Sequence, residues 1–128
     1  TGIITAGIAI GGRVTPPNAL QSVVEQWNGT NWTEVGDLNT ARYSMFASKF
    51  TYDDSFIGGG QTPSSVTNTE IWDGISWTET SDMNTARGAG ASAGTQTSGL
   101  ASTGYSGTYQ SAVEEWTSSS NTIKVLTD

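Results

Sequence analysis

Two stretches of the chain nearly repeat each other: VEQWNGTNWTEVGDLNTAR at residues 24–42 and TEIWDGISWTETSDMNTAR at residues 69–87. Each contains a glutamate two residues before a tryptophan, a second tryptophan five residues further on, and a final Asn-Thr-Ala-Arg. A weaker third copy begins with VEEW at 113–116. The leading tryptophans, Trp27, Trp72 and Trp116, are separated by 45 and 44 residues, so the chain is built from units of about 44 residues.

Short strand-forming runs and turn residues divide each unit. An Asp-Gly or Asn-Gly pair between alternating apolar residues favours a two-residue hairpin turn, and the chain has Asn28-Gly29 and Asp73-Gly74 in equivalent places. Four antiparallel strands in 40 to 50 residues are typical of a β-propeller blade. In the middle unit we predict strands at 43–50, 55–59, 67–72 and 75–80, a turn at Asp53-Asp54 and a loop at 61–65.

The order of the repeated residues in each unit resembles the kelch repeat. The repeat sequences are similar to those of kelch-like proteins of marine bacteriophages, which are virion structural or tail-associated proteins. The first unit has Gly11, Gly12, Glu25, Trp27, Trp32, Leu38 and Arg42, and the second has Gly58, Gly59, Glu70, Trp72, Trp77, Met83 and Arg87. The third keeps Glu114 and Trp116 but departs from the pattern. It has a single Gly104, has Asn121 where the second tryptophan is expected, and ends at TIKVLTD before any arginine.

We therefore expect an all-β chain forming one repeat domain over 1–128, with blade units at about 1–42, 43–87 and 88–128. The first unit is expected to be incomplete, because residues 1–12 align with 93–104 and so begin after most of the innermost strand. Closed propellers typically have four to eight blades. Three units therefore predict part of a larger or oligomeric propeller: a longer protein, two chains giving six blades, or chains stacked into a fibre.

The anchors are predicted to serve packing. Tryptophans suit the space between blades, glycine pairs allow positive φ, and the small residues at 88–95 suit an innermost strand. Arg42 and Arg87 are expected as buried guanidinium groups that join blades through carbonyls or through Glu25 and Glu70, since a guanidinium has five donors. The alternatives are sugar-stacking tryptophans and arginines that bind an anionic ligand.

Composition argues against most catalytic chemistry. The 128 residues include no Cys and no His, which excludes thiolate ligands, a cysteine nucleophile and imidazole acid–base catalysis. We predict no enzyme activity, no cofactor and no metal. Asp53-Asp54 lacks the oxygen-rich spacing of a calcium loop, and Asp37 and Asp82, a conceivable glycosidase pair, occupy equivalent places in different units.

Charge and hydropathy limit the partners. A net charge of −7 with five Lys and Arg residues argues against nucleic-acid binding, and no apolar run reaches the roughly 18 residues of a membrane span. Asn28 and Asn31 each begin an Asn-x-Thr sequence, which makes them candidate glycosylation sites at a hairpin tip.

Three functions remain open. The first is a structural module of a phage virion or extracellular appendage, which contacts copies of itself or other virion or appendage proteins in assembly or surface attachment. The second is a lectin-like propeller that binds surface glycans through loop aromatics such as Tyr105 and Tyr109. The third is a kelch adaptor that binds a protein partner.

Overall fold

A computed structural model describes residues 2–48, 54–117 and 122–126. These residues form three four-stranded antiparallel sheets and no helix, which confirms the predicted all-β blades. Blade 1 consists of β1 (Gly2–Ile3), β2 (Ala6–Val14), β3 (Ala19–Trp27) and β4 (Trp32–Glu34). Blade 2 consists of β5 (Phe46–Ala47), β6 (Ser55–Gly58), β7 (Thr69–Trp72) and β8 (Trp77–Thr80), and blade 3 of β9 (Ala91–Gly94), β10 (Ser98–Ser102), β11 (Val113–Thr117) and β12 (Thr122–Leu126).

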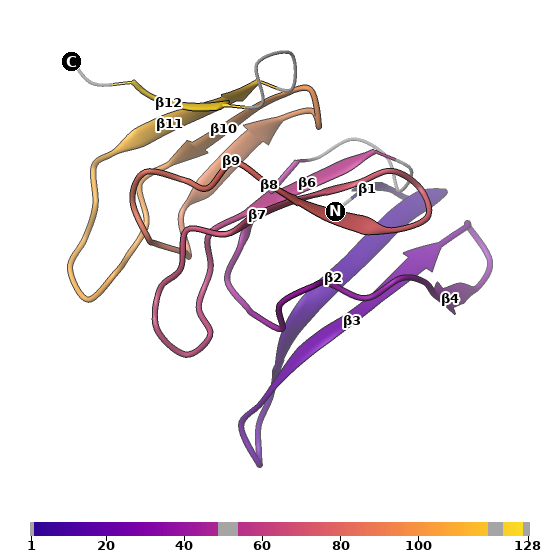
Figure 1. The fold of residues 1–128 in the computed structure, drawn as a ribbon. Coiled ribbons are helices and arrows are strands. Elements are labelled where there is room, and N and C mark those ends of the chain that lie inside the picture. Colours follow the sequence, from indigo (N-terminus) through magenta and orange to yellow (C-terminus); the bar gives the residue numbers. More distant parts are fainter. Residues whose placement is uncertain (1, 49–53, 118–121, 127–128) are drawn as a thin grey trace.

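Within each blade the strands lie side by side in chain order, and the three blades form an open arc with blade 2 in the middle (Figure 1). The pairing register is the same in all three: Trp27 pairs with Trp32, Trp72 with Trp77, and Trp116 with Ile123. The expectation that Asn121 takes the second tryptophan's place is therefore wrong, because the register gives that place to Ile123. Asn121 itself lies outside the described residues.

The first strand of each blade is the innermost one. β5 and β9 are in contact: the Ser92 hydroxyl donates to the Ala47 carbonyl (2.8 Å) and accepts from the Ala47 N–H (3.2 Å). In blade 1, Gly2 pairs with Gly7 as Gly94 pairs with Gly99 in blade 3. β1 thus corresponds to the last part of an innermost strand.

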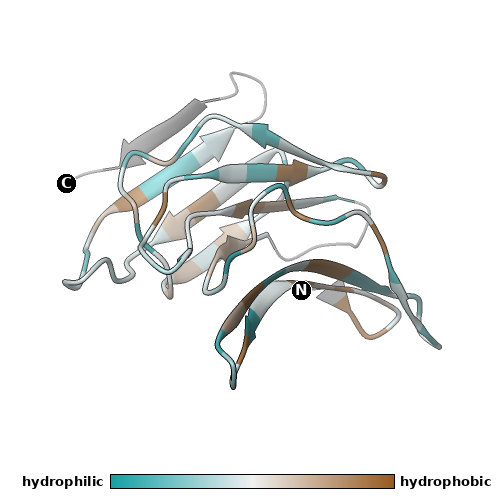
Figure 2. Cartoon of the chain, turned by 60° about the horizontal axis from the view of Figure 1, so that its bottom comes forward, coloured by the Kyte–Doolittle hydropathy of each residue, from teal (hydrophilic) through white to brown (hydrophobic). Residues whose placement is uncertain are grey.

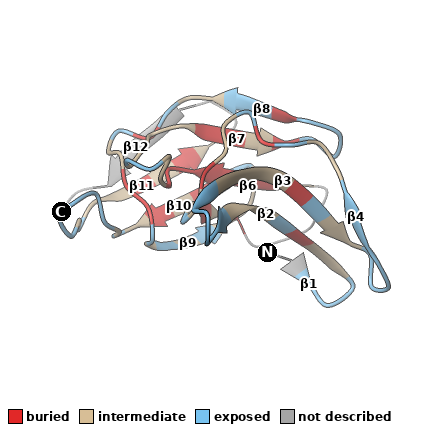
Figure 3. Ribbon diagram, turned by 90° about the horizontal axis from the view of Figure 1, so that it is seen from below, coloured by how far each residue is buried: buried red, intermediate tan, exposed pale blue. Residues whose placement is uncertain are grey.

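The hydrophobic cores lie between blades. Apolar and polar positions alternate irregularly along the strands (Figure 2), and the faces where two blades meet bury apolar side chains against each other. The buried positions gather in β6, β7, β10 and β11 (Figure 3). Between blades 2 and 3, Phe56 stacks on Trp116 with ring centroids 5.4 Å apart, and Phe46, Met83 and Ala101 form a buried cluster. The core between blades 1 and 2 contains Ile8, Val24, Leu38, Ile57, Trp72 and Trp77.

The outer hairpins differ from the predicted two-residue turns. Their loops have four residues, and only the glycines, Gly29 and Gly74, have positive φ. The Asp73 carboxylate accepts the backbone N–H groups of Ile75 and Ser76, at 2.8 Å each. This side chain holds the turn, which shortens the predicted strand 75–80 to Trp77–Thr80.

The other three predicted strands of this unit are also shorter than expected: 67–72 becomes Thr69–Trp72, 55–59 becomes Ser55–Gly58, and 43–50 becomes Phe46–Ala47. Residues 49–50 of that segment, and Asp53 of the predicted Asp53-Asp54 turn, lie outside the described residues.

The glycine pair of blade 2 is Gly59-Gly60 and not Gly58-Gly59. Gly58 ends β6 in ordinary strand conformation, whereas Gly59 and Gly60 have φ of 63° and 99°. They match Gly11 and Gly12, at 55° and 129°. In blade 3, Thr103 (61°) and Gly104 (115°) adopt the same shape. We call this pair of residues with positive φ the left-handed corner. It is present in all three blades, although threonine replaces the first glycine in blade 3.

Candidate functional site

Arg42 follows blade 1 in the chain, but its side chain is fully buried in blade 2. Nη1 donates to the carbonyls of Gly59 (3.0 Å) and Asn68 (2.6 Å), and Nη2 donates to Oε1 of Glu70 (2.8 Å). Glu70 lies on the central strand β7 and is also buried. One guanidinium thus joins two blades through two carbonyls and one carboxylate.

The other carboxylate oxygen of Glu70 is held by the same incoming segment. Oε2 accepts from the backbone N–H of Asn39 and from its side-chain Nδ2, both at 2.9 Å, and that Nδ2 also donates to the Trp77 carbonyl at 2.9 Å. Both oxygens of Glu70 are therefore bound by the Asn-Thr-Ala-Arg that leaves blade 1. We call this arrangement the arginine latch: the Asn and Arg of an Asn-x-x-Arg segment that follows one blade both donate hydrogen bonds to the glutamate of the next blade.

The latch occurs a second time between blades 2 and 3. Arg87 Nη2 donates to Oε2 of Glu114 (3.0 Å) and to the Ala101 carbonyl (3.3 Å), and Nη1 donates to the Thr103 carbonyl. The backbone N–H of Asn84 donates to Oε1 of Glu114 at 2.5 Å. Arg87 and Glu114 are buried, as Arg42 and Glu70 are.

The backbone of each latch arginine belongs to its own blade. The Arg42 carbonyl accepts the N–H of Gly12, and the Arg87 carbonyl accepts the N–H of Gly60, both at 2.9 Å. An added Cβ on Gly59 would lie 2.3 Å from the Arg87 carbonyl oxygen, so glycine is needed there for space as well as for φ. The left-handed corner and the latch are parts of one junction.

Burial and the neighbouring carboxylates have opposite effects on the pKa of the latch residue Arg42. Removal from water lowers the pKa of Arg42, while the adjacent Glu70 carboxylate, and more weakly Glu79 and Asp82, act to raise it. A buried pair of this kind gains little net stability when intact, but removing one partner costs about 3–5 kcal/mol because a buried charge is left uncompensated. The latch therefore specifies how blades join.

The corresponding residues of blade 1 are differently placed. We expected Glu25 to hold an arginine, and this was wrong: the ion pairs of the described residues are Arg42–Glu70 and Arg87–Glu114, and Glu25 is exposed. Trp27 is half-buried, with Nε1 donating to the Ile4 carbonyl (2.9 Å), and Trp32 is 52% exposed. These side chains lie on the face of blade 1 that is turned away from blade 2, since Val24 and Leu38 form its contact with blade 2, and no other blade of the described residues covers them.

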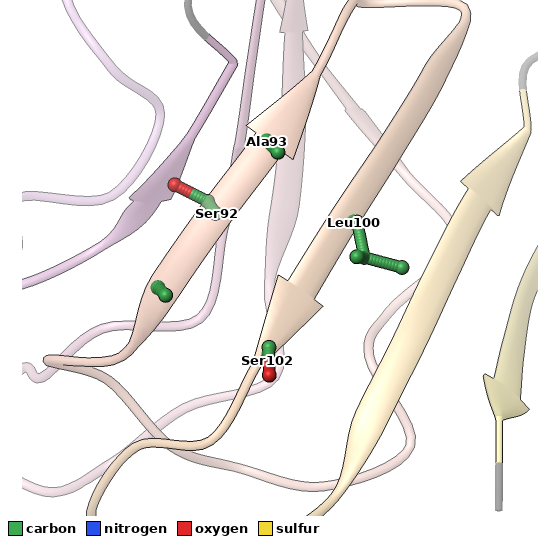
Figure 4. A pocket seen from close by; sticks show the side chains of 5 residues that line it. Ser92, Ala93, Leu100 and Ser102 are labelled. Carbon is green, nitrogen blue, oxygen red and sulfur yellow. The ribbon is translucent and has the colours of Figure 1, made fainter.

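The opposite end of the arc presents a shallow hollow on blade 3, lined by Ala91, Ser92, Ala93, Leu100 and Ser102 (Figure 4). Ser92 and Leu100 point to opposite sides of the sheet, Ser92 toward blade 2. The hollow is mostly apolar, and its lining contains no titratable side chain.

The remaining candidate residues occupy loops. Tyr105 and Tyr109 form an edge-to-face pair 5.4 Å apart in the β10–β11 loop, with exposures of 41% and 92%. Asn28 Oδ1 accepts the N–H groups of Thr30 and Asn31 at 2.9 Å each, so it stabilises the turn as Asp73 does.

Asp37 and Asp82 do not meet. Each accepts a hydroxyl of its own blade, from Ser22 (2.9 Å) and Thr67 (3.0 Å) respectively. Residues 2–48, 54–117 and 122–126 contain no group of three metal-ligating side chains. No helix in the same part of the chain is long and apolar enough to cross a membrane.

Sequence reasoning missed the two asparagines of the latch, Asn39 and Asn84. The signal was present, since Asn-Thr-Ala-Arg is identical in the two units. Two residues, Thr and Ala, lie between Asn and Arg in that segment, and this spacing lets both reach one carboxylate.

No protein-family model and no curated protein matches the chain. Among solved structures it is similar to YjhT, with a TM-score of 0.74 and 18% sequence identity over 94% of this chain. The chain spans 42% of the length of YjhT. At this identity the likeness shows the fold alone: three blades of a β-propeller that do not close into a ring.

Proposed function

We propose that the chain is a non-enzymatic structural and interaction module of a phage virion or extracellular appendage, built as a kelch-like propeller segment, that assembles through its open blade faces. Its partners are copies of itself or other proteins of the same particle. The observation that carries the proposal is a contrast between equivalent residues: Trp77 is 5% exposed beneath blade 1, whereas Trp32 is 52% exposed on the outer face of blade 1.

The outer face of blade 1 has the character of an interface. Trp27 and Trp32 lie 5.5 Å apart with a 42° tilt, nearly the arrangement of Trp72 and Trp77 at 5.4 Å and 40°. Exposed aromatic groups on a sheet face favour association, because covering them removes apolar surface from water. The virion or extracellular setting rests on the resemblance of the repeats to phage kelch-like proteins.

Sedimentation velocity over a range of concentrations tests the assembly proposal. We expect concentration-dependent association that Trp32→Ser weakens at least tenfold. Ile75→Ser is the matched control, since Ile75 is 82% exposed at the tip of the β7–β8 loop and should not affect association. A chain that stays monomeric at every concentration, or that responds equally to both substitutions, contradicts the proposal.

A second candidate, glycan binding, is favoured by the exposed Tyr105–Tyr109 pair. Sugar rings stack on aromatic faces, and Tyr109 offers nearly its whole ring to solvent. A glycan array decides between the two: a saccharide-dependent signal that disappears in Tyr109→Ala supports a lectin-like role, and no such signal supports the structural module.

A further inference from the structure

We infer that the outer face of blade 1 is a receptor for a β-blade that presents an Asn-x-x-Arg edge, with Glu25 as the carboxylate that binds the incoming guanidinium. The inference rests on the proposed assembly function and names the chemistry of the partner. The two latches inside the chain are its template, because each shows what covers the same face of the next blade.

The register places Glu25 at the position of the two buried glutamates. Glu25 pairs with Ala9 and Glu34 across its neighbouring strands, as Glu70 pairs with Ile57 and Glu79. In blade 3, Glu114 pairs with Ala101 and Val125 in the same way. Each glutamate also stands two residues before the leading tryptophan of its unit.

The charges around that position are repeated as well. Arg42 lies in the field of Glu70, Glu79 and Asp82. The blade 1 counterparts of these three are Glu25, Glu34 and Asp37, which are all exposed. Asp37 is held by Ser22 as Asp82 is held by Thr67, so the counterpart carboxylate has the same anchorage. Glu25 and Glu34 pair across neighbouring strands, and within the described part of the chain none of the three carboxylates forms an ion pair. Such a group of carboxylates is complementary to a guanidinium.

The apolar part of the face is prearranged. The tilt and separation of Trp27 and Trp32 match those of Trp72 and Trp77, although no second blade among the described residues packs on them. One of the two carbonyls that accept from Arg42, that of Gly59, also has a counterpart at Gly11, which has nearly the same positive φ. The outer face of blade 1 therefore offers an incoming blade the same arrangement of tryptophan rings and the same left-handed corner that blade 2 offers to blade 1.

Each arginine in the described part of this chain already has a partner within the chain. Arg42 and Arg87 close the two internal latches, and Arg13 lies over the ring of Tyr43, 4.5 Å from its centroid. The guanidinium for Glu25 must come from a blade outside these residues.

A chain extended after Asp128 by Leu-Asn-Thr-Ala-Arg supplies such an edge. Val125 pairs with Glu114 as Glu79 pairs with Glu70, and Asp82 stands three residues after Glu79 just as Asp128 stands three residues after Val125. The added segment therefore continues blade 3 with the spacing of residues 83–87. The matched control carries Leu-Asn-Thr-Ala-Gln, which keeps length and polarity but removes the charge.

Sedimentation equilibrium compares the two extended chains with and without Glu25→Gln. We expect the arginine extension to associate at least tenfold more tightly than the glutamine extension, and Glu25→Gln to abolish that difference. Glu25 is exposed, so the variant should fold, which circular dichroism verifies. Equal association of the two extensions, or a tenfold gain that persists in Glu25→Gln, overturns the inference.

The proposed function has its own readout in the same experiment. If association of the unextended chain is weakened by Trp32→Ser but the arginine has no effect, assembly through this face stands and the receptor role of Glu25 fails. If Trp32→Ser has no effect either, the proposed function fails as well.

Discussion

Trp77 and Trp32 are the same residue at the same place in two blades, and only their neighbours differ. Trp77 is covered by blade 1, and Trp32 is half exposed. We expect Trp77→Ala to lower the free energy of unfolding by about 3–5 kcal/mol, because it leaves a cavity between blades, and Trp32→Ala to lower it by less than about 1 kcal/mol. Denaturant unfolding of both variants measures this, and equal losses would contradict the packing role of the repeated tryptophans.

Asp73 makes one turn sensitive to acid. Hydrogen bonds from the backbone N–H groups of Ser76 and Ile75 lower the pKa of Asp73 below its ordinary value of 3.8. Since the folded-state pKa is below the unfolded one, the contribution to stability is present above the ordinary pKa and is lost as the pH falls through the folded-state pKa. In NMR titrations the Ile75 and Ser76 amide shifts should move in this acid range.

The control for this titration is Asp73→Asn, which copies the turn that Asn28 forms in blade 1. Its amide shifts at the turn should stay flat over the same pH range. Identical titration curves in both proteins would show that the carboxylate does not hold the turn.

At the scale of elements, the left-handed corner after the second strand of blade 2 holds the backbone of the next latch arginine, because Gly60 donates to the Arg87 carbonyl. Gly59 has φ of 63°, and a Cβ there would meet the Arg87 carbonyl at 2.3 Å. Gly107 also has positive φ (101°), but an added Cβ would meet nothing within 4 Å. Gly107→Ala should cost about 1–2 kcal/mol of backbone strain. Gly59→Ala should cost clearly more, because the carbonyl that bonds Gly60 must move.

Thermal unfolding of the two alanine variants measures the difference. Equal shifts in melting temperature would mean that the corner is only a matter of backbone conformation and that the close approach of Arg87 is unimportant.

Sequence reasoning predicted the elements better than the contacts between them. The tryptophan and glycine spacing located four strands per unit, because side-chain alternation and turn residues are local signals. It did not decide whether Arg42 pairs with Glu25 of its own unit or Glu70 of the next, since a repeat places a glutamate in both. Blade stacking, which is not local, selects Glu70.

Two further misses have local causes. Thr103 carries positive φ although threonine rarely adopts it, so the corner of blade 3 was invisible to a search for glycine pairs. The Asp73 and Asn28 side chains replace the backbone geometry of a two-residue turn by accepting N–H groups, which lengthens each loop to four residues.

At the scale of the whole molecule, the chain is a linear array of three blades with two latched junctions. In such arrays stability is approximately the sum of each unit and its nearest-neighbour interfaces. The junctions of blade 1 with blade 2 and of blade 2 with blade 3 each contain a buried arginine–glutamate pair, while the outer face of blade 1 has the glutamate alone. The three glutamates are therefore an internal comparison of one residue in filled and unfilled junctions.

The most direct test of the arginine latch is the unfolding free energy of Glu25→Gln, Glu70→Gln and Glu114→Gln in dilute, monomeric protein. Glu70→Gln and Glu114→Gln should each cost about 3 kcal/mol, where the ranges for an unsatisfied buried group and for a broken buried ion pair meet. Glu25→Gln should stay within about 0.5 kcal/mol of the parent, as an exposed substitution does. Three equal losses, or no loss at Glu70 and Glu114, would contradict the claim that these latches join the blades.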